Sequence, residues 1–134
     1  MDTNIRKLRR DDLIYPDLCY KILGVLFDVW TNVGAGHKEK IYQRAVSVAL
    51  QGAGFVIKEQ CPAKLVYKNS PIGVYYFDFL IDNKIVLEIK VRNYFSKKDI
   101  EQLASYLRAS RLKLGILAHF TANGVKYKRI VNVK

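Results

Sequence analysis

The chain has 134 residues, half of them hydrophobic, and its 23 Lys and Arg against 12 Asp and Glu give a formal net charge of +11. This length suits a single domain with a full core, and the apolar content excludes a disordered chain. The basic balance favours an anionic partner such as nucleic acid, although a protein that is merely basic has the same composition.

The cysteines and the apolar stretches exclude further classes of protein. Cys19 and Cys61 lack the spacing of zinc ligands, so zinc is not expected and both are predicted to be reduced and structural. The apolar stretches are too short or too interrupted to span a bilayer, and the first residues lack the apolar segment of a secretory signal. We expect a cytoplasmic protein that does not contact a membrane.

The N-terminal half predicts two helices. Residues 1–15 are charged and are predicted to be a basic extension of a single domain over residues 16–134. A helix is expected from about Asp17 to Val33, and its apolar surface is wider than one face requires, which suits a homodimer interface. A second helix is expected from about Lys38 to Gln51. Its core stripe is predicted to be Ile41, Ala45, Val48 and Ala49.

The next segments predict strands. Short strands are expected at residues 55–59 and 63–67, separated by Pro62. After a turn, Val74–Ile81 and Lys84–Val91 are rich in β-branched and aromatic residues and predict a hairpin.

The C-terminal part predicts one helix and two more strands. Ser96 is a plausible N-cap with Asp99 three residues later, and the helix is expected to reach about Ser110. Strands are expected at Leu112–Phe120 and Lys126–Val133. The order helix, helix, strands, helix, strands predicts a mixed α/β domain built on one sheet.

The hydrophobic pattern selects the register of the predicted hairpin. A two-residue loop would set Asp78 opposite Leu87 and place its charge on the apolar face. A three-residue loop at residues 82–84, with positive φ at Asn83 or Lys84 or with a bulge, sets Asp78 opposite Glu88. The other face is then wholly apolar and is expected to pack on the core. Its members are Tyr75, Phe77, Phe79, Ile81, Ile85, Leu87, Ile89 and Val91.

Asp78, Glu88 and Lys90 are therefore predicted to share one face of the hairpin. Charges inside otherwise apolar strands are costly unless they have partners, and two carboxylates with an amine could hold a divalent cation and a water. Simpler interpretations remain open. Asp78 could only pair with Lys90 or Lys84, and Glu88 with Lys90 could be the charge pattern of an edge strand.

The spacing Asp78-x9-Glu88-x-Lys90 resembles that of the PD-(D/E)xK nuclease superfamily. Gln102 and Tyr106 form a QxxxY motif like that of its exonuclease-like branch. Upstream, residues 36–42 read G-x-x-E-x-x-Y, the motif of the GxxExxY family of the same superfamily. The resemblance implies a restriction-endonuclease-like core, in which helices flank a central mixed β-sheet.

The resemblance also implies roles for individual residues. Asp78, Glu88 and the Ile89 carbonyl would bind Mg²⁺ or Mn²⁺, and Glu39 would hold a metal-bound water or a second ion. Lys90 would orient the water or offset charge on the phosphate. Gln102 would orient Lys90 or contact the scissile region, and Tyr106 would touch phosphate or support Gln102. Without the resemblance, Glu39 is an ordinary first-turn carboxylate, and Gln102 and Tyr106 are ordinary helix residues.

Basic residues crowd the C-terminal half and are candidates for phosphate contacts or for a merely solvated rim. The candidates are Arg92, Lys97, Lys98, Arg108, Arg111, Lys126 and Lys128. No helix-turn-helix or zinc-finger motif is present to read bases.

The leading hypothesis is a metal-dependent nuclease that acts on nucleic acid, with DNA preferred. The alternatives are a non-catalytic module that binds nucleic acid or a partner, and a nuclease subunit that needs a partner protein. Intact Asp78, Glu88 and Lys90 favour the nuclease.

Overall fold

The computed structural model describes residues 14–132, so residues 1–13 of the predicted basic extension lie outside the described part of the chain. Its helices are α2 (Pro16–Val33), α3 (Glu39–Gly52) and α4 (Lys97–Ser110). Its strands are β1 (Ile57–Tyr67), β2 (Ser70–Ile81), β3 (Ile85–Lys90), β4 (Leu114–Thr121) and β5 (Gly124–Val131).

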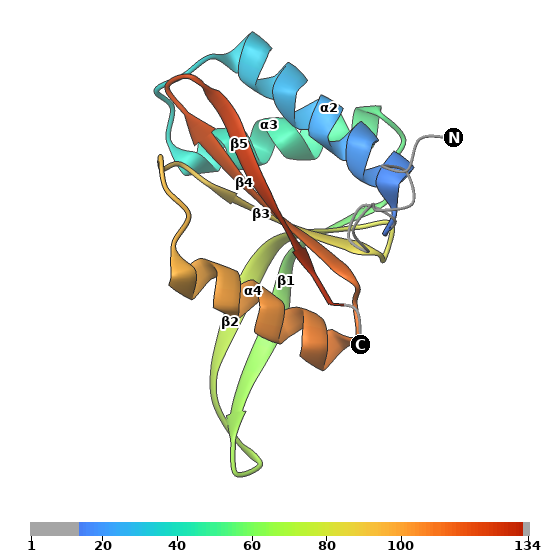
Figure 1. The fold of residues 1–134 in the computed structure, drawn as a ribbon, viewed down its shortest axis with the longest axis vertical. Helices are drawn as coiled ribbons and strands as arrows, with labels where there is room; N and C mark the ends of the chain where they lie inside the picture. The colour runs from blue at the N-terminus through green and yellow to red at the C-terminus, as the bar shows by residue number, and fades with distance from the viewer. Residues whose placement is uncertain (1–13, 133–134) are drawn as a thin grey trace, which may run out of the picture.

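One mixed sheet forms the centre of the molecule. The strands lie in the order β1-β2-β3-β4-β5, and only the β3–β4 pair is parallel. A parallel pair needs a long crossover, which α4 supplies. Helices α2 and α3 cover one face of the sheet and α4 covers the other, while the β1–β2 hairpin projects beyond the sheet (Figure 1). The predicted mixed sheet with flanking helices is confirmed.

The larger core lies between the sheet and the α2–α3 pair. Helix α3 buries Tyr42, Val46 and Leu50, which recur every four residues. The predicted stripe is wrong for Ile41, which is 41% exposed, and for Val48, which is 74% exposed, whereas Ala45 and Ala49 are partly buried against the core. Both sets of residues have helical spacing, and the contact with the sheet and α2 decides which set is buried.

Strand β1 is continuous, so the prediction of two short strands separated by Pro62 is wrong. Pro62 lies within β1 and pairs with Tyr76 of β2. Because β1 is an edge strand, a residue without an N–H group is tolerated there.

The predicted hairpin register is confirmed at its closed end. Phe79 pairs with Leu87 and Ile81 pairs with Ile85, which leaves residues 82–84 as the three-residue loop. Positive φ angles occur at Asp82 (51°) and Asn83 (56°), so the expectation holds for Asn83 and not for Lys84. Short Asp and Asn side chains tolerate this conformation.

The regular alternation of side chains along β2 breaks at Asp78. The β1–β2 ladder has no pair between Gln60 and Asp78, and Gln60 has a φ of 52°. Phe79 packs in the core under α2 and α3, whereas Phe77 packs in a second core under α4.

The prediction of one wholly apolar hairpin face is therefore wrong in part. It holds for Phe79, Ile81, Ile85, Leu87 and Ile89, which share the larger core. Phe77 and Tyr75 belong to the α4 side, and Val91 is exposed. A break in strand alternation moves later side chains to the other face.

Helix α4 begins as predicted. The Ser96 side chain accepts a hydrogen bond from the Asp99 N–H, and the helix ends at Ser110. Leu103 packs so closely on β4 that a Cβ on Gly115 would lie 2.8 Å from it.

Two remaining expectations concern the cysteines and membrane spans. Cys19 and Cys61 are buried and free. No helix within residues 14–132 is long and apolar enough to cross a membrane.

Candidate active site

Asp78 and Glu88, called here the carboxylate pair, meet where β2 and β3 separate. The Asp78 N–H donates to Glu88 Oε1 at 2.9 Å, and the Ile89 N–H donates to Asp78 Oδ2 at 2.7 Å. The last pair of the β2–β3 ladder is Phe79 with Leu87. Beyond this pair, the two carboxylates accept hydrogen bonds from the backbone N–H groups that strand pairing leaves without a partner. The predicted juxtaposition of the two residues is thus present.

Burial dominates the electrostatics of the carboxylate pair. Asp78 is 6% exposed and Glu88 is 4% exposed. Burial, with the nearby Asp78 charge, raises the pKa of Glu88 to about 7. Burial also raises the pKa of Asp78, although the Ile89 N–H and other hydrogen bonds oppose this. Such a pair attracts protons or cations more strongly than surface carboxylates do.

Lys90 lies beside the carboxylate pair. Its Nζ is 3.7 Å from Glu88 Oε2, and its side chain is mostly buried. Strand β3 is the central strand of the sheet, so an edge-strand charge pattern does not explain these residues. The lysine partly offsets the negative charge of the pair.

Helix α3 approaches the pair through Glu39 and Gln43. Gln43 Nε2 donates to Asp78 Oδ1 at 2.8 Å and to Glu39 Oε2 at 3.3 Å. The pKa of Glu39 is raised, chiefly by burial. The charge of Lys90 opposes this rise, and the charge of Asp78 adds to it. Glu39, Asp78, Glu88 and Lys90 therefore belong to one electrostatic cluster. Gln43 was missed by the sequence analysis, and its place one helical turn after Glu39 is the signal that could have found it.

The tyrosine of the G-x-x-E-x-x-Y motif has a structural role. Tyr42 is buried, stacks on Phe120 with ring centroids 4.4 Å apart, and donates a hydrogen bond to the Gly34 carbonyl at 2.6 Å. It thereby fixes the loop between α2 and α3, and so the start of α3 where Glu39 lies.

Tyr75 is a second residue that the sequence analysis missed. Its hydroxyl donates to Glu88 Oε2 at 2.8 Å. Burial and the Glu88 charge raise the pKa of Tyr75, so the hydroxyl keeps its proton. No sequence signal marks it, because the regular alternation of β2 assigns it to the apolar face.

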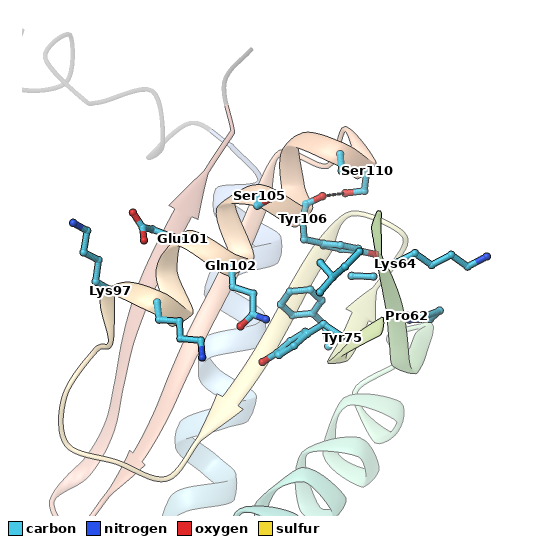
Figure 2. A pocket seen from close by; sticks show the side chains of 14 residues that line it. Pro62, Lys64, Tyr75, Lys97, Glu101, Gln102, Ser105, Tyr106 and Ser110 are labelled. Carbon is cyan, nitrogen blue, oxygen red and sulfur yellow. Dashed lines mark hydrogen bonds between the residues drawn. The ribbon is translucent and has the colours of Figure 1, made fainter. Parts of the chain in front are cut away.

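Gln102 and Tyr106 lie on the inner side of α4. Tyr106 packs on Phe77 with ring centroids 4.7 Å apart, and in Figure 2 the Gln102 side chain extends toward Tyr75. Within residues 14–132, no hydrogen bond joins either side chain to the carboxylate pair or to Lys90. The structure brings these two residues near Tyr75 and not into the cluster itself.

Comparison with known proteins gives the family. Residues 16–130 match the family model described as PD-(D/E)XK nuclease superfamily. The chain belongs to this superfamily. No curated protein matches it.

A solved structure gives a likeness of fold. The crystal structure of SSO0001 resembles this chain with a TM-score of 0.53 and 21% identity, over 69% of this chain and 50% of that one. At this identity the likeness shows the fold alone, and the chain spans half the length of the structure it matches.

Members of the PD-(D/E)XK superfamily typically use divalent metal ions. The oxygen donors of the carboxylate pair suit Mg²⁺, which is often held by one or two carboxylates with waters and substrate phosphate. Within the described part of the chain, no three His, Cys, Asp or Glu side chains lie close enough to hold a metal together. Asp78 and Glu88 therefore fit as a two-carboxylate site, with Glu39 outside the first set of ligands.

The predicted phosphate-contacting residues divide into groups within this superfamily fold. Lys97 and Lys98 are exposed at the start of α4, whereas Arg108 and Arg111 are exposed at its other end, about 20 Å away for a helix of this length. Exposed Lys126 and Lys128 lie on β5. Arg92 is engaged, since its Nη1 lies 2.8 Å from Asp99 Oδ2.

His119, to which the sequence analysis gave no role, lies beside the cluster on β4. It is fully buried, is paired in register with Lys90, and packs on Phe95 in a tilted arrangement with ring centroids 4.1 Å apart. Burial lowers its pKa, as does the charge of Arg92, so the ring is neutral near pH 7. It adds no charge next to the Lys90 strand.

Proposed function

We propose that this chain is a metal-dependent nuclease that hydrolyses phosphodiester bonds of nucleic acid, with DNA preferred. The observation that carries the proposal is the buried carboxylate pair next to Lys90, in a chain of the PD-(D/E)XK nuclease superfamily. Buried carboxylates with raised pKa values are costly to retain unless they have a task.

The carboxylate pair would hold the metal ion. Asp78 Oδ1 and Oδ2 and Glu88 Oε1 and Oε2 each accept one hydrogen bond, which leaves lone pairs free on every oxygen. The Ile89 N–H fixes Asp78, and the Ile89 carbonyl is proposed as a further ligand. When bound, Mg²⁺ or Mn²⁺ would lower the pKa of a water and stabilise negative charge on the phosphate.

The neighbouring side chains would position the reactants. The Lys90 ammonium group would orient the attacking water or offset charge on the phosphate. Gln43 would hold Asp78 and Glu39 together, and Tyr75 would keep Glu88 in place. Glu39 would accept a hydrogen bond from water near Lys90. Gln102 and Tyr106 would contact the nucleic acid rather than the metal ion.

Two alternatives share the same fold. A non-catalytic binding module would use the carboxylates weakly or not at all, and a nuclease subunit would need a partner protein. We place these behind the nuclease because Asp78, Glu88 and Lys90 are all present and in contact. Assignment to the GxxExxY family, a cytoplasmic location and a homodimer are further parts of the proposal.

The test is cleavage of labelled single- and double-stranded DNA and RNA with Mg²⁺, with Mn²⁺ and with chelator. Asp78→Asn and Lys90→Ala should abolish cleavage, while Lys21→Ala, an exposed lysine on α2, should leave it unchanged. Metal-dependent cleavage that survives both site variants would refute the assignment of the site. Salt-sensitive binding without any cleavage would favour the binding module.

A further inference from the structure

A cavity of about 950 Å³ lies between α4 and the β1–β2 hairpin (Figure 2). Its volume is in the upper part of the range for small-ligand sites. No residue of this cavity belongs to the carboxylate pair. The residues of the hairpin that line it include Pro62, Lys64, Tyr75 and Phe77, and those of α4 include Lys97, Gln102, Ser105, Tyr106 and Ala109.

Three aromatic rings form a continuous row along the cavity. The ring centroids of Tyr75 and Phe77 are 4.7 Å apart, and those of Phe77 and Tyr106 are also 4.7 Å apart. Phe77 is buried, whereas Tyr75 and Tyr106 are partly exposed, so two of the rings have faces or edges open to a ligand. Accessible tyrosine rings of this kind can each stack on the flat face of a nucleobase.

The rim of the cavity is basic. Lys64 from the hairpin and Lys97 and Lys98 from α4 are exposed, and Glu101 is the one acidic residue among those that line the cavity. The ligand therefore meets aromatic rings inside and positive charge outside. This combination suits a base with its phosphate.

Tyr75 connects the cavity to the carboxylate pair. It lines the cavity, and its hydroxyl donates to Glu88 Oε2 at 2.8 Å. A base stacked in the cavity would therefore have its phosphate close to the carboxylates. Gln102, which also lines the cavity and extends toward Tyr75, could hydrogen-bond to a base edge.

We propose that this cavity binds unpaired nucleobases of a single strand next to the bond that is cleaved. Bases in a duplex are already stacked and paired, so they cannot enter without being extruded. An unpaired strand offers free base faces to the rings of Tyr75 and Tyr106, and phosphates to the three lysines. The inference rests on the proposed function for the position of cleavage, and it assigns the substrate to single strands or unpaired ends.

The test measures binding in chelator, where no cleavage can occur. The probes are a labelled oligothymidylate and a labelled duplex of equal length. Ser105 and Ala109 are exposed residues of the cavity wall, so the double variant Ser105→Leu/Ala109→Leu partly fills the cavity without replacing a core residue. Ala53→Leu, at an exposed position after α3, is the matched control.

The filled cavity should weaken oligothymidylate binding about tenfold and change duplex binding by less than about twofold. A second pair of variants separates the ring from the hydroxyl: Tyr106→Leu should weaken oligothymidylate binding, and Tyr106→Phe should retain it. Unfolding temperatures show whether each variant is folded. The proposal would be overturned if oligothymidylate binding is unchanged by both the filled cavity and Tyr106→Leu. It would also be overturned if these variants weaken oligothymidylate and duplex binding equally.

The two proposals can fail separately. If the wild type never cleaves but its binding responds to the cavity variants, the cavity proposal stands and the nuclease proposal fails. If Asp78→Asn abolishes cleavage while the cavity variants leave oligothymidylate binding unchanged, the nuclease proposal stands and the cavity proposal fails.

Discussion

Helices α3 and α4 both approach the carboxylate pair, but they contribute in different ways. Helix α3 reaches it directly, since Gln43 donates to Asp78 and the Glu39 charge is coupled to Asp78 and Lys90. Helix α4 faces the cavity instead, and its nearest link to the pair is through Tyr75 of β2. The difference indicates that α3 holds Asp78 and adds the Glu39 charge to the site, whereas α4 shapes the space beside it.

The same difference separates fixed from adaptable surroundings. Gln43 is held between two carboxylates, so its amide has a defined orientation. Gln102 has no hydrogen bond to the cluster within residues 14–132, and it lies at an open cavity. Residues of the first kind position reacting groups, and residues of the second kind meet the substrate.

The largest expected effect comes from the carboxylates themselves. Asp78→Asn should lower the cleavage rate by more than about a hundredfold. Removing only a residue that hydrogen-bonds to a metal ligand already costs about 10- to 100-fold. Without metal the variant should remain folded, because the loss of a buried like charge next to Glu88 offsets the replacement of one hydrogen-bond-accepting oxygen of Asp78 by an NH2 group. Cleavage rates and thermal unfolding in chelator measure the two effects. An unstable variant would mean that the loss of cleavage reflects folding.

The contrast between the two glutamines tests the comparison directly. Gln43→Leu should lower cleavage about tenfold or more and raise the Mg²⁺ concentration needed for half-maximal rate, because Asp78 loses its donor. Gln102→Leu should leave that Mg²⁺ concentration unchanged and act on substrate binding. Equal shifts in the Mg²⁺ requirement for both variants would break the distinction between α3 and α4.

The raised pKa of Glu88 predicts how stability depends on pH. In the folded protein this pKa is about 7, against 4.5 for an unperturbed carboxyl, so the folded state binds the proton more tightly. The stability that this group contributes is therefore present below pH 4.5 and is lost as pH rises toward 7. Asp78 acts in the same direction.

Thermal unfolding without divalent cations, followed from pH 4.5 to 8, measures this loss. The side chain of the Glu88→Gln variant cannot titrate. The unfolding temperature of the wild type should therefore fall relative to that of the variant as pH rises. A difference that is constant over this range would show that burial does not raise the pKa.

The smallest effect is expected on the outer face of α3. Val48→Ser should change the free energy of unfolding by less than about 0.5 kcal/mol, since this side chain is largely exposed. Val46→Ser makes the same chemical change at a fully buried position and should cost about 2 kcal/mol or more. Chemical denaturation of both variants compares them, and similar costs would mean that α3 packs on a different face.

Much of the site follows from the sequence because its information is local. The alternation of apolar and charged residues in the hairpin allows only one register, and this register brings Asp78 to Glu88. The position of Lys90 on the same face as Glu88 is equally local, since residues two apart in a strand share a face. The Ser96 cap and the helix it begins are equally local.

Local patterns in the sequence predict the helices, most of the strands, the hairpin register and the shared face of Asp78, Glu88 and Lys90, because each depends on periods of two or 3.6 residues within one segment. Packing between elements sets which face of α3 is buried, where the alternation of β2 breaks, and how Gln43 and Tyr75 hold the carboxylates. The hydrogen bonds of Tyr75 and Gln43 to the carboxylates join residues 13 and 35 positions apart, and periodicity within one segment does not show which distant residues meet. The cavity beside the site has the same origin, since two elements that are separate in the chain form its walls.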